Sequence, residues 1–261
     1  MSKLQIAVLA SAAGLFLLLY FTCETKPPSQ KAIEKSRAFT MEQTDITTLL
    51  AEAKDRIDSR GMSAILPLEA ELEAAKTDSA RVQTFKSLSG KWYELNETAL
   101  AGFYAEEAAN LEGKAEAWGI AGTTYALCAQ QSEEGKVREF CAARALKAFE
   151  SAISLDPNEL THRINLALTY ADFPPSDNPM KGILMLRDLD EKNPDNPSVL
   201  FQLGRLAIRT GQWERAIERL NRVTTLDPGN RNAWCLLGQA YQESGDQQKA
   251  ADCRAKCEQT N

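Results

Sequence analysis

The chain has 261 residues, of which 44% are apolar and 25% are charged, and its formal net charge is −6. This composition is typical of a folded globular protein and excludes a chain that is disordered throughout. The sequence has no dense basic run and no basic-plus-aromatic groove signature, so we expect no nucleic-acid partner.

The residues that catalysis usually needs are scarce in this sequence. The single histidine, His162, is expected at the start of a helix with a structural role. There is no Gly-rich phosphate loop, no Gly-x-Ser-x-Gly turn and no His-Glu-x-x-His motif. The adjacent pairs Glu106-Glu107 and Glu133-Glu134 are typical of solvated helix faces. We therefore expect no enzyme, no cofactor and no metal site.

Residues 1–23 predict a membrane anchor. Residues 4–21, LQIAVLASAAGLFLLLYF, form an uncharged run of eighteen residues. A helix needs about 20 apolar residues to span the hydrocarbon core of a bilayer. Lys3 and the amino terminus favour the cytoplasmic side of the membrane, so we expect the rest of the chain in the periplasm or another extracytoplasmic space.

Two other fates of this segment stay open. Cys23 directly follows the apolar run, as does the lipid-modified cysteine that it resembles in bacterial lipoproteins, although Tyr20 and Thr22 depart from that family's processing site. A cleaved signal peptide has an apolar stretch of roughly 7–15 residues and small residues at its cleavage site. Both alternatives place the rest of the chain in the same extracytoplasmic space. The remaining alternative is a topology in which the rest of the chain lies on the cytoplasmic side. Residues 24–39 contain two consecutive prolines and predict a short, stiff tether.

Residues 40–112 predict four helices, and we find no sustained strand alternation after the tether. We expect breaks at Arg60-Gly61, at residues 76–78 and at Asn96, with Pro67 in the first turn of the second helix. Short breaks are typical of antiparallel helices, so the fold class is all-α. The apolar faces comprise Ile46, Leu49, Leu50, Ala53 and Ile57, then Ile65, Leu68, Leu72 and Ala75, then Val82, Phe85, Leu88, Trp92 and Leu95, then Leu100, Phe103, Tyr104 and Leu111.

The rest of the chain, residues 113–261, repeats with a period of 34 residues. Pro194 and Pro228 are 34 residues apart, as are the Leu-Gly pairs at 203–204 and 237–238, the glycines at 211 and 245, and the alanines at 216 and 250. An earlier unit closes at Pro157, and the one before it begins near Trp118 with a longer hairpin. A fixed period of this length indicates stacked structural repeats.

The order Trp, Leu-Gly, Tyr, Gly-Asp and Ala, with Asp-Pro closing each unit, resembles the tetratricopeptide repeat. The resemblance implies repeats at about 115–157, 160–194, 197–228 and 231–258, and a right-handed α-α superhelix behind an N-terminal transmembrane helix. Residues 40–112 lack the pattern and are divergent repeats or a helical cap. In each repeat we expect Gly204 or Gly238 of the first helix to face Ala216 or Ala250 of the second, because small residues let two backbones approach.

The resemblance also implies a concave groove formed by the first helices. Phe201, Arg205 and Arg209, with Asn232 and Gln239 opposite, would suit an extended peptide with an acidic or carboxylate end. Some family members clamp a C-terminal carboxylate with Lys and Asn side chains. Asn165 matches one clamp position, but Gly119 and Thr123 stand where the first Lys and Asn would be, so we predict no such clamp. The remaining groove positions are Ser198, Ile208, Cys235, Gln242, Thr161, Ile164, Leu168 and Asp172.

Six cysteines are more than packing alone requires. Cys128 and Cys141 lie equally far from the turn near residue 134, so a disulfide forms if their Cα atoms come within about 7 Å, and two buried thiols are the alternative. Cys253 and Cys257 are four residues apart, but no further ligand accompanies them, so we predict small packed side chains and not a zinc site. Cys235 is expected as a groove-facing thiol without a partner.

These observations lead to one main hypothesis. We expect a membrane-anchored scaffold that binds a protein or peptide partner in its concave groove, at the extracytoplasmic face of the membrane. One alternative is a cell-envelope assembly factor or chaperone-like factor that holds unfolded chains. The other is a structural protein that forms homo-oligomers through its last helix.

Overall fold

The computed structural model describes Gln5, residues 46–133 and residues 135–260. The predicted anchor, Cys23 and the predicted tether lie, apart from Gln5, outside the described residues. Within the described part, no helix is long and apolar enough to cross a membrane. The chain divides into two units, residues 1–48 and 49–261, and the following paragraphs concern the second unit and the helix that leads into it. All regular structure in the described part is helical, as predicted.

The first four described helices are α3 (Ile46–Arg56), α4 (Ser59–Ala74), α5 (Asp78–Glu94) and α6 (Thr98–Glu112). Two predictions about α4 are wrong. Its N-cap is Asp58, whose side chain accepts a hydrogen bond from the backbone of Gly61 at 2.7 Å, so the helix runs through Arg60-Gly61. Pro67 consequently lies inside α4 and not in its first turn. The cap decides the boundary here because an Asp side chain satisfies a free N–H group of the first turn.

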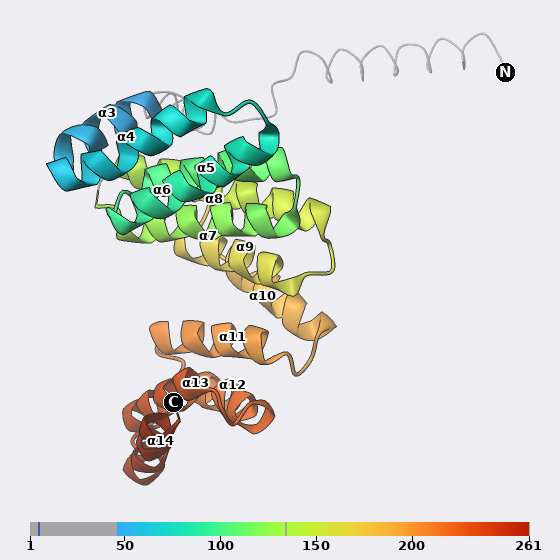
Figure 1. Ribbon diagram of the computed structural model, residues 1–261. Coiled ribbons are helices and arrows are strands. Elements are labelled where there is room, and N and C mark those ends of the chain that lie inside the picture. The colour runs from blue at the N-terminus through green and yellow to red at the C-terminus, as the bar shows by residue number, and fades with distance from the viewer. Residues whose placement is uncertain (1–4, 6–45, 134, 261) are drawn as a thin grey trace. The chain divides into compact units, whose positions relative to one another are not determined.

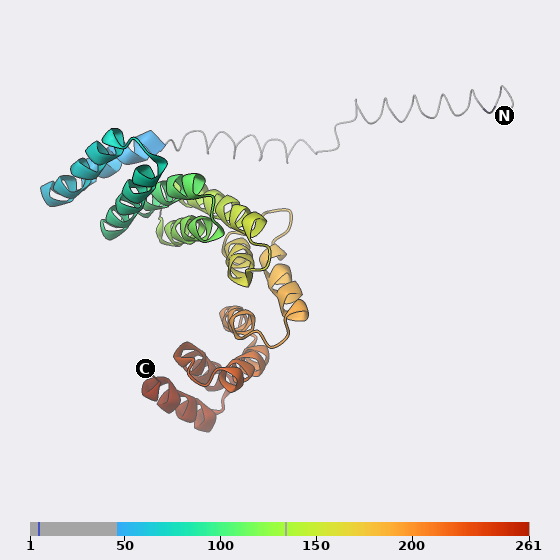
Figure 2. The ribbon, with the colours of Figure 1, turned by 45° about the vertical axis from the view of Figure 1, so that its right-hand side comes forward.

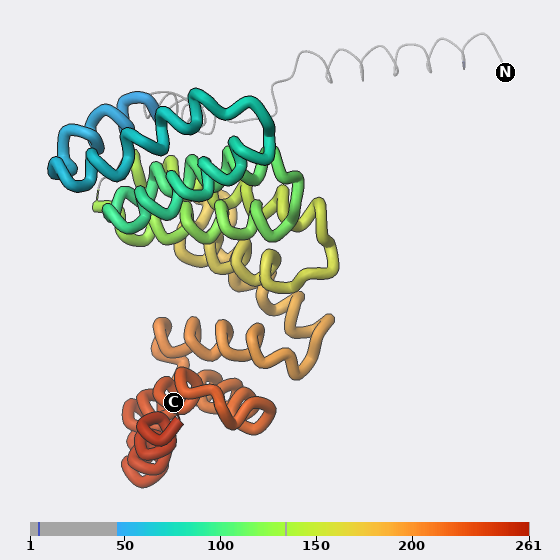
Figure 3. The backbone as a smooth tube through the Cα atoms, viewed as in Figure 1, coloured from blue at the N-terminus to red at the C-terminus, as the bar shows by residue number. Residues whose placement is uncertain are grey.

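Eight further helices form four successive pairs, which can be followed as a tube in Figure 3. The first pair has long helices of 17 and 21 residues, and the others have 12 to 14 residues. The extra length that the sequence predicted in the first unit is therefore helical. The pairs are α7 (Ala115–Gln131) with α8 (Gly135–Leu155), α9 (Leu160–Asp172) with α10 (Lys181–Lys192), α11 (Pro197–Arg209) with α12 (Trp213–Leu226), and α13 (Arg231–Ser244) with α14 (Gln247–Gln259).

Local sequence signals explain where these helices begin and end. Asn196 and Asn230 cap α11 and α13 by accepting hydrogen bonds from the backbone N–H groups of Val199 and Ala233. Gly211 and Gly245 follow α11 and α13 with φ angles of 68° and 92°, a left-handed conformation that Gly adopts at little cost. The division into a helical region at 40–112 and a repeat array at 113–261 stays a prediction.

Consecutive helices of the second unit pack against each other, and Figures 1 and 2 show the two helices of each pair side by side. Gly238 faces the second helix of its pair as predicted, because a Cβ atom there would lie 3.4 Å from the backbone oxygen of Ala250. Gly204 also faces its partner helix, but it contacts Leu220 and not Ala216, with 2.8 Å from the added Cβ to Cγ. Both glycines therefore lie in a helix–helix seam.

A buried polar group joins α6, α7 and α8. The Glu106 side chain is only 7% exposed, so the predicted solvated role is wrong for this residue. Its carboxylate accepts a hydrogen bond from the Tyr125 hydroxyl at 2.8 Å and from the Arg144 guanidinium at 2.9 Å. Burial, followed by the neighbouring Glu106 charge, raises the pKa of the Tyr125 hydroxyl well above its usual value. The network satisfies the carboxylate that the fold has removed from water.

Candidate functional site

The predicted groove residues come from α11 and α13. Arg205, Arg209, Asn232 and Gln239 are exposed, whereas Phe201 is half-buried and packs against the core cluster around Leu220 and Leu237. Phe201 therefore contributes to the hydrophobic core as well as to the surface.

Arg209 is engaged within the protein, although 52% of its side chain is exposed. Its guanidinium forms an ion pair with Asp172 at the end of α9 and donates to the backbone oxygen of Ala171 at 3.3 Å. The Gln130 side chain at the end of α7 donates to the second oxygen of Asp172 at 3.1 Å. These contacts connect the first helices of three successive pairs. Arg205 makes no such contact among the described residues.

Two positions carried over from the family pattern do not face a groove. Ile164 is 6% exposed and belongs to a core cluster with Leu186 and Leu189 of α10. Cys235 forms a disulfide with Cys257 of α14, with a Cα–Cα distance of 5.1 Å. The prediction of an unpartnered thiol is wrong because the antiparallel arrangement of α13 and α14 brings these two residues together.

The described chain contains a second disulfide, between Cys128 of α7 and Cys141 of α8, with a Cα–Cα distance of 5.9 Å. Cys253 is a free, buried thiol whose pKa is raised by burial. Among the described residues, no group of three or more His, Cys, Asp or Glu side chains is placed to hold a metal ion.

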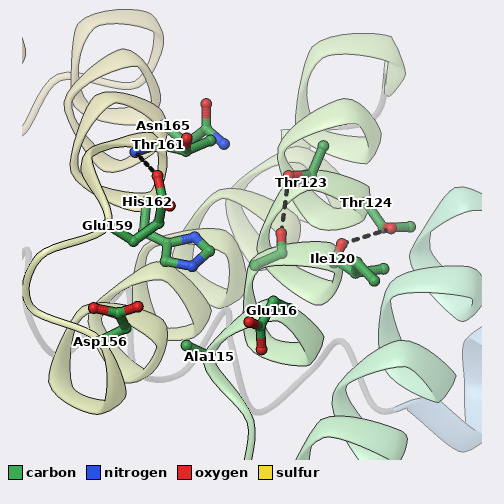
Figure 4. A pocket seen from close by; sticks show the side chains of 11 residues that line it. Ala115, Glu116, Ile120, Thr123, Thr124, Asp156, Glu159, Thr161, His162 and Asn165 are labelled. Atoms are coloured by element: carbon green, nitrogen blue, oxygen red, sulfur yellow. Dashed lines mark hydrogen bonds between the residues drawn. The ribbon is translucent and has the colours of Figure 1, made fainter.

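A pocket of about 430 Å³ lies between the first halves of α7 and α9 (Figure 4). It therefore joins the first helices of two successive pairs. Thr123 and Asn165, named above for their clamp positions, both line it, and so does Gly119. The other lining residues are Ala115, Glu116, Ile120, Thr124, Asp156, Glu159, Thr161 and His162.

His162 projects from α9 toward α7 in this pocket (Figure 4). The residue is 7% exposed, and its Nδ1 atom is buried without a hydrogen-bond partner in the described structure. The ring fits because residue 119 is glycine: an added Cβ atom would lie 2.5 Å from Cε1 of His162. A buried polar atom without a partner costs about 1–3 kcal/mol.

Three carboxylates line the pocket, and two of them make local backbone contacts. Glu159 caps α9 by accepting a hydrogen bond from the backbone of Thr161 at 2.8 Å, and the hydrogen bonds from Thr161 lower the pKa of this carboxyl. Asp156 accepts from the backbone of Asn158 at 3.0 Å. Glu116 lies in the first turn of α7 and is exposed. Glu116 and Glu159 also fit their positions because negative charge is favourable near a helix N-terminus.

Sequence reasoning missed both this pocket and the disulfide between Cys235 and Cys257. The disulfide had a usable signal, because Cys235 and Cys257 are equally far from Asp246, as Cys128 and Cys141 are from their turn. The pocket had a weaker signal: Asp156 and Glu159 are close in sequence, but Glu116 is 40 residues away from Asp156, and only the stacking of α7 on α9 brings it to them.

Comparison with known proteins gives matches within the repeated region and across the fold. Two family models, both described as tetratricopeptide repeat, match residues 181–240 and 232–259. A curated relative, the TPR repeat-containing protein PA0015 of Pseudomonas aeruginosa, is 38% identical over 66 residues, which make up 24% of this chain and 63% of that protein. The chain therefore spans less than two thirds of that relative's length.

Several solved structures are similar at low sequence identity. A crystal structure of MamA is 16% identical, with 69% of this chain and 91% of that chain covered and a TM-score of 0.44. MamA from Desulfovibrio magneticus RS-1 is 18% identical, with 69% and 94% covered and a TM-score of 0.46. YrrB, described as a TPR protein with an unusual peptide-binding site, is 19% identical, with 74% and 92% covered and a TM-score of 0.41.

Proposed function

Because residues 181–259 are tetratricopeptide repeats, we propose that this chain is a scaffold that binds a protein or peptide partner on the face formed by the first helices of its pairs. We infer that the pairs stack as the right-handed superhelix typical of such repeats, which offers an extended concave surface. The role is binding and not catalysis.

The observation that carries this proposal is the pocket between α7 and α9. It lies between first helices of successive pairs, and its lining includes the exposed side chains of Glu116, Thr123, Glu159, Thr161 and Ile120. Farther along the array, Arg205, Asn232 and Gln239 on α11 and α13 are also exposed. A run of exposed polar and apolar side chains on neighbouring helices suits an extended partner.

We further propose that residues 1–23 anchor the chain in a membrane and that the repeats face the periplasm or another extracytoplasmic space, where the scaffold would serve cell-envelope assembly or hold client chains. The uncharged run at residues 4–21 supports the anchor. The two disulfides support an oxidising compartment, because such bonds rarely persist in the cytosol. Anchoring raises the local concentration of the scaffold for membrane-bound partners.

Self-assembly through the last helix is the less favoured role. The exposed residues of α14 are polar except for two alanines, whereas an end that stacks on a second copy needs an apolar face. The exposed set consists of Gln247, Gln248, Lys249, Ala251, Asp252, Arg254, Ala255, Lys256, Glu258 and Gln259.

Site-specific photo-crosslinking of the full chain in intact cells tests the scaffold role. A photoreactive residue replaces Thr124 or Arg205 on first helices, and Glu150 or Glu218 on second helices serves as the matched control. We expect a discrete crosslinked partner from the first-helix positions and none from the controls. Equal capture from both sets, or no capture from Thr124 and Arg205, contradicts the proposal.

A further inference from the structure

We propose that the pocket between α7 and α9 binds a lysine or arginine side chain of the partner, so that the partner segment is basic at this point. The inference rests on the proposed scaffold role and assigns the chemistry of one subsite within it. The sequence predicts an acidic or carboxylate end of the partner at another place, beside Arg205 and Arg209 of α11, so the two subsites would differ in the charge that they select.

The charge of the pocket is one argument. Glu116, Asp156 and Glu159 supply three carboxylates, and the eleven lining residues include no lysine and no arginine. Within the described part of the chain, none of these three carboxylates takes part in an ion pair with a basic side chain. A cationic side chain of the partner would therefore give these carboxylates an ion-pair partner. Such charge complementarity selects among partners.

The hydrogen-bonding groups give a second, independent argument. The hydroxyl groups of Thr123 and Thr124 donate to the backbone oxygens of Gly119 and Ile120, both at 2.9 Å, so their protons are already used. Their oxygens can then only accept. Together with the carboxylates they make acceptors the majority of the polar groups in the pocket, beside the amide of Asn165 and the hydroxyl of Thr161. Lysine and arginine are the charged side chains that only donate.

His162 points to a missing donor in the same pocket. Its imidazole projects from α9 toward α7 (Figure 4), it is more than nine-tenths buried, and its Nδ1 atom has no partner in the described structure. In the tautomer that carries its proton on Nε2, the Nδ1 atom accepts, and a bound ammonium or guanidinium group would then supply the donor that it lacks. Ile120, which is 59% exposed, also lines the pocket and offers an apolar surface for the methylene stem of the ligand.

A carboxylate ligand does not fit the same place. The positions where related repeats carry a clamping Lys and Asn hold Gly119 and Thr123 here, so the pocket has no cation for an acidic group. Such a ligand would instead meet Glu116, Asp156 and Glu159 at close range. Of the two arginines named farther along, on α11, Arg209 is paired with Asp172, and both lie outside this pocket.

The single histidine of the sequence allows a direct test. The full chain, without a histidine tag and with labelled histidine, gives a single imidazole Cε1–H signal in an NMR spectrum, and that signal reports on the pocket. The probes are blocked pentapeptides of alanine with a central lysine, arginine, norleucine or glutamate. We expect the lysine and arginine peptides to shift the signal in a saturable way and the other two to leave it in place.

A charge-neutral variant completes the test. Glu116→Gln, Asp156→Asn and Glu159→Gln together keep the shape and the backbone contacts while they remove the charge, and we expect binding of the lysine peptide to weaken about tenfold or more. Glu150→Gln, an exposed acid of α8 outside the pocket, is the matched control and should bind as before. Circular dichroism confirms that each variant is folded.

Two results would overturn the assignment: no shift with any peptide, or an equal shift with the glutamate peptide. Undiminished binding by the neutral variant would do the same. The outcome is separable from that of the scaffold role. If Thr124 and Arg205 still crosslink to a partner while the pentapeptides leave the His162 signal unchanged, the scaffold role is supported and only the assignment of a basic subsite is refuted.

Discussion

The imidazole of His162 in α9 occupies the space that a side chain at Gly119 in α7 would need. A Cβ atom at residue 119 would lie 2.5 Å from Cε1 and 2.9 Å from Nδ1 of the ring. The contact joins the first helices of two successive pairs at the edge of the pocket, so it links the stacking of the repeats to the shape of the site.

Gly119→Ala should therefore destabilise the protein. The new methyl group must displace a buried ring, and overpacking of this kind typically lowers the free energy of unfolding by about 1–3 kcal/mol. Gly90→Ala in α5 is the control, because no atom lies within 4 Å of its added Cβ. There we expect a gain of roughly 0.5–1 kcal/mol from helix propensity. Urea unfolding measures both, and equal effects at the two sites would refute the packing argument.

Loss of the buried Glu106 carboxylate should cost more than loss of its neighbour. Glu106→Leu leaves the Tyr125 hydroxyl and the Arg144 guanidinium without their acceptor, and we expect a loss of about 2–4 kcal/mol in the free energy of unfolding. Glu107→Gln, next in sequence and partly exposed, should change it by no more than about 0.5 kcal/mol. Thermal unfolding of both variants gives the comparison, and a mild effect of Glu106→Leu would show that the network contributes little.

The two disulfides should differ in their response to a reductant. Cys128 and Cys141 are 1% and 0% exposed, whereas Cys235 and Cys257 are only partly buried. A thiolate must reach a sulfur atom to open the bond. We expect Cys235 and Cys257 to be reduced at lower dithiothreitol concentration, as measured by alkylation and mass spectrometry of the folded protein. Earlier labelling of Cys128 and Cys141 would contradict the burial argument.

Asp195 should make stability depend on pH in the acid range. Hydrogen bonds from Arg222, both 2.6 Å long, and then its charge hold the pKa of this carboxyl below its usual value. Because the folded-state pKa is the lower one, the stabilisation is present above the unfolded pKa of about 3.9 and is lost as the pH falls through the folded value.

Asp195→Asn tests this dependence without disturbing the backbone. Residue 195 has a φ angle of 67°, a left-handed conformation that Asn tolerates well. The stability difference between the parent and the variant, from urea unfolding, should be constant above pH ~5 and should shrink in more acidic solution. Asp177→Asn removes the same charge from an exposed carboxylate that has no ion pair among the described residues. A difference of the same form for that variant would argue against the role of Arg222.

The helical fold was predictable because its signals are local or periodic. Gly211 and Gly245 end the first helices as the 34-residue spacing indicated, and the apolar spacing placed α5 and α6. The start of α4 was missed because the cap Asp58 overrode the apparent break at Gly61. Caps depend on one side-chain contact, which a pattern of apolar residues does not register.

The site was less predictable because contacts between repeats decide it. Family positions alone do not reveal that Asp172 holds Arg209 or that Ile164 turns into the core. Those outcomes depend on how far one pair of helices is displaced along the next. Cys235 is the exception, because a count of residues from the turn would have identified its partner.

The bond between Arg209 and Asp172 has a mechanical consequence. The ion pair connects the C-terminal end of α9 to the C-terminal end of α11, and the hydrogen bond from Gln130 to Asp172 connects α7 to the same pair. An acidic group that bound Arg209 would compete with Asp172 for the guanidinium. Weakening of the Arg209–Asp172 ion pair would loosen the link between α9 and α11. Binding at that end of the array would therefore be coupled to the spacing of neighbouring repeats and to the curvature of the stack.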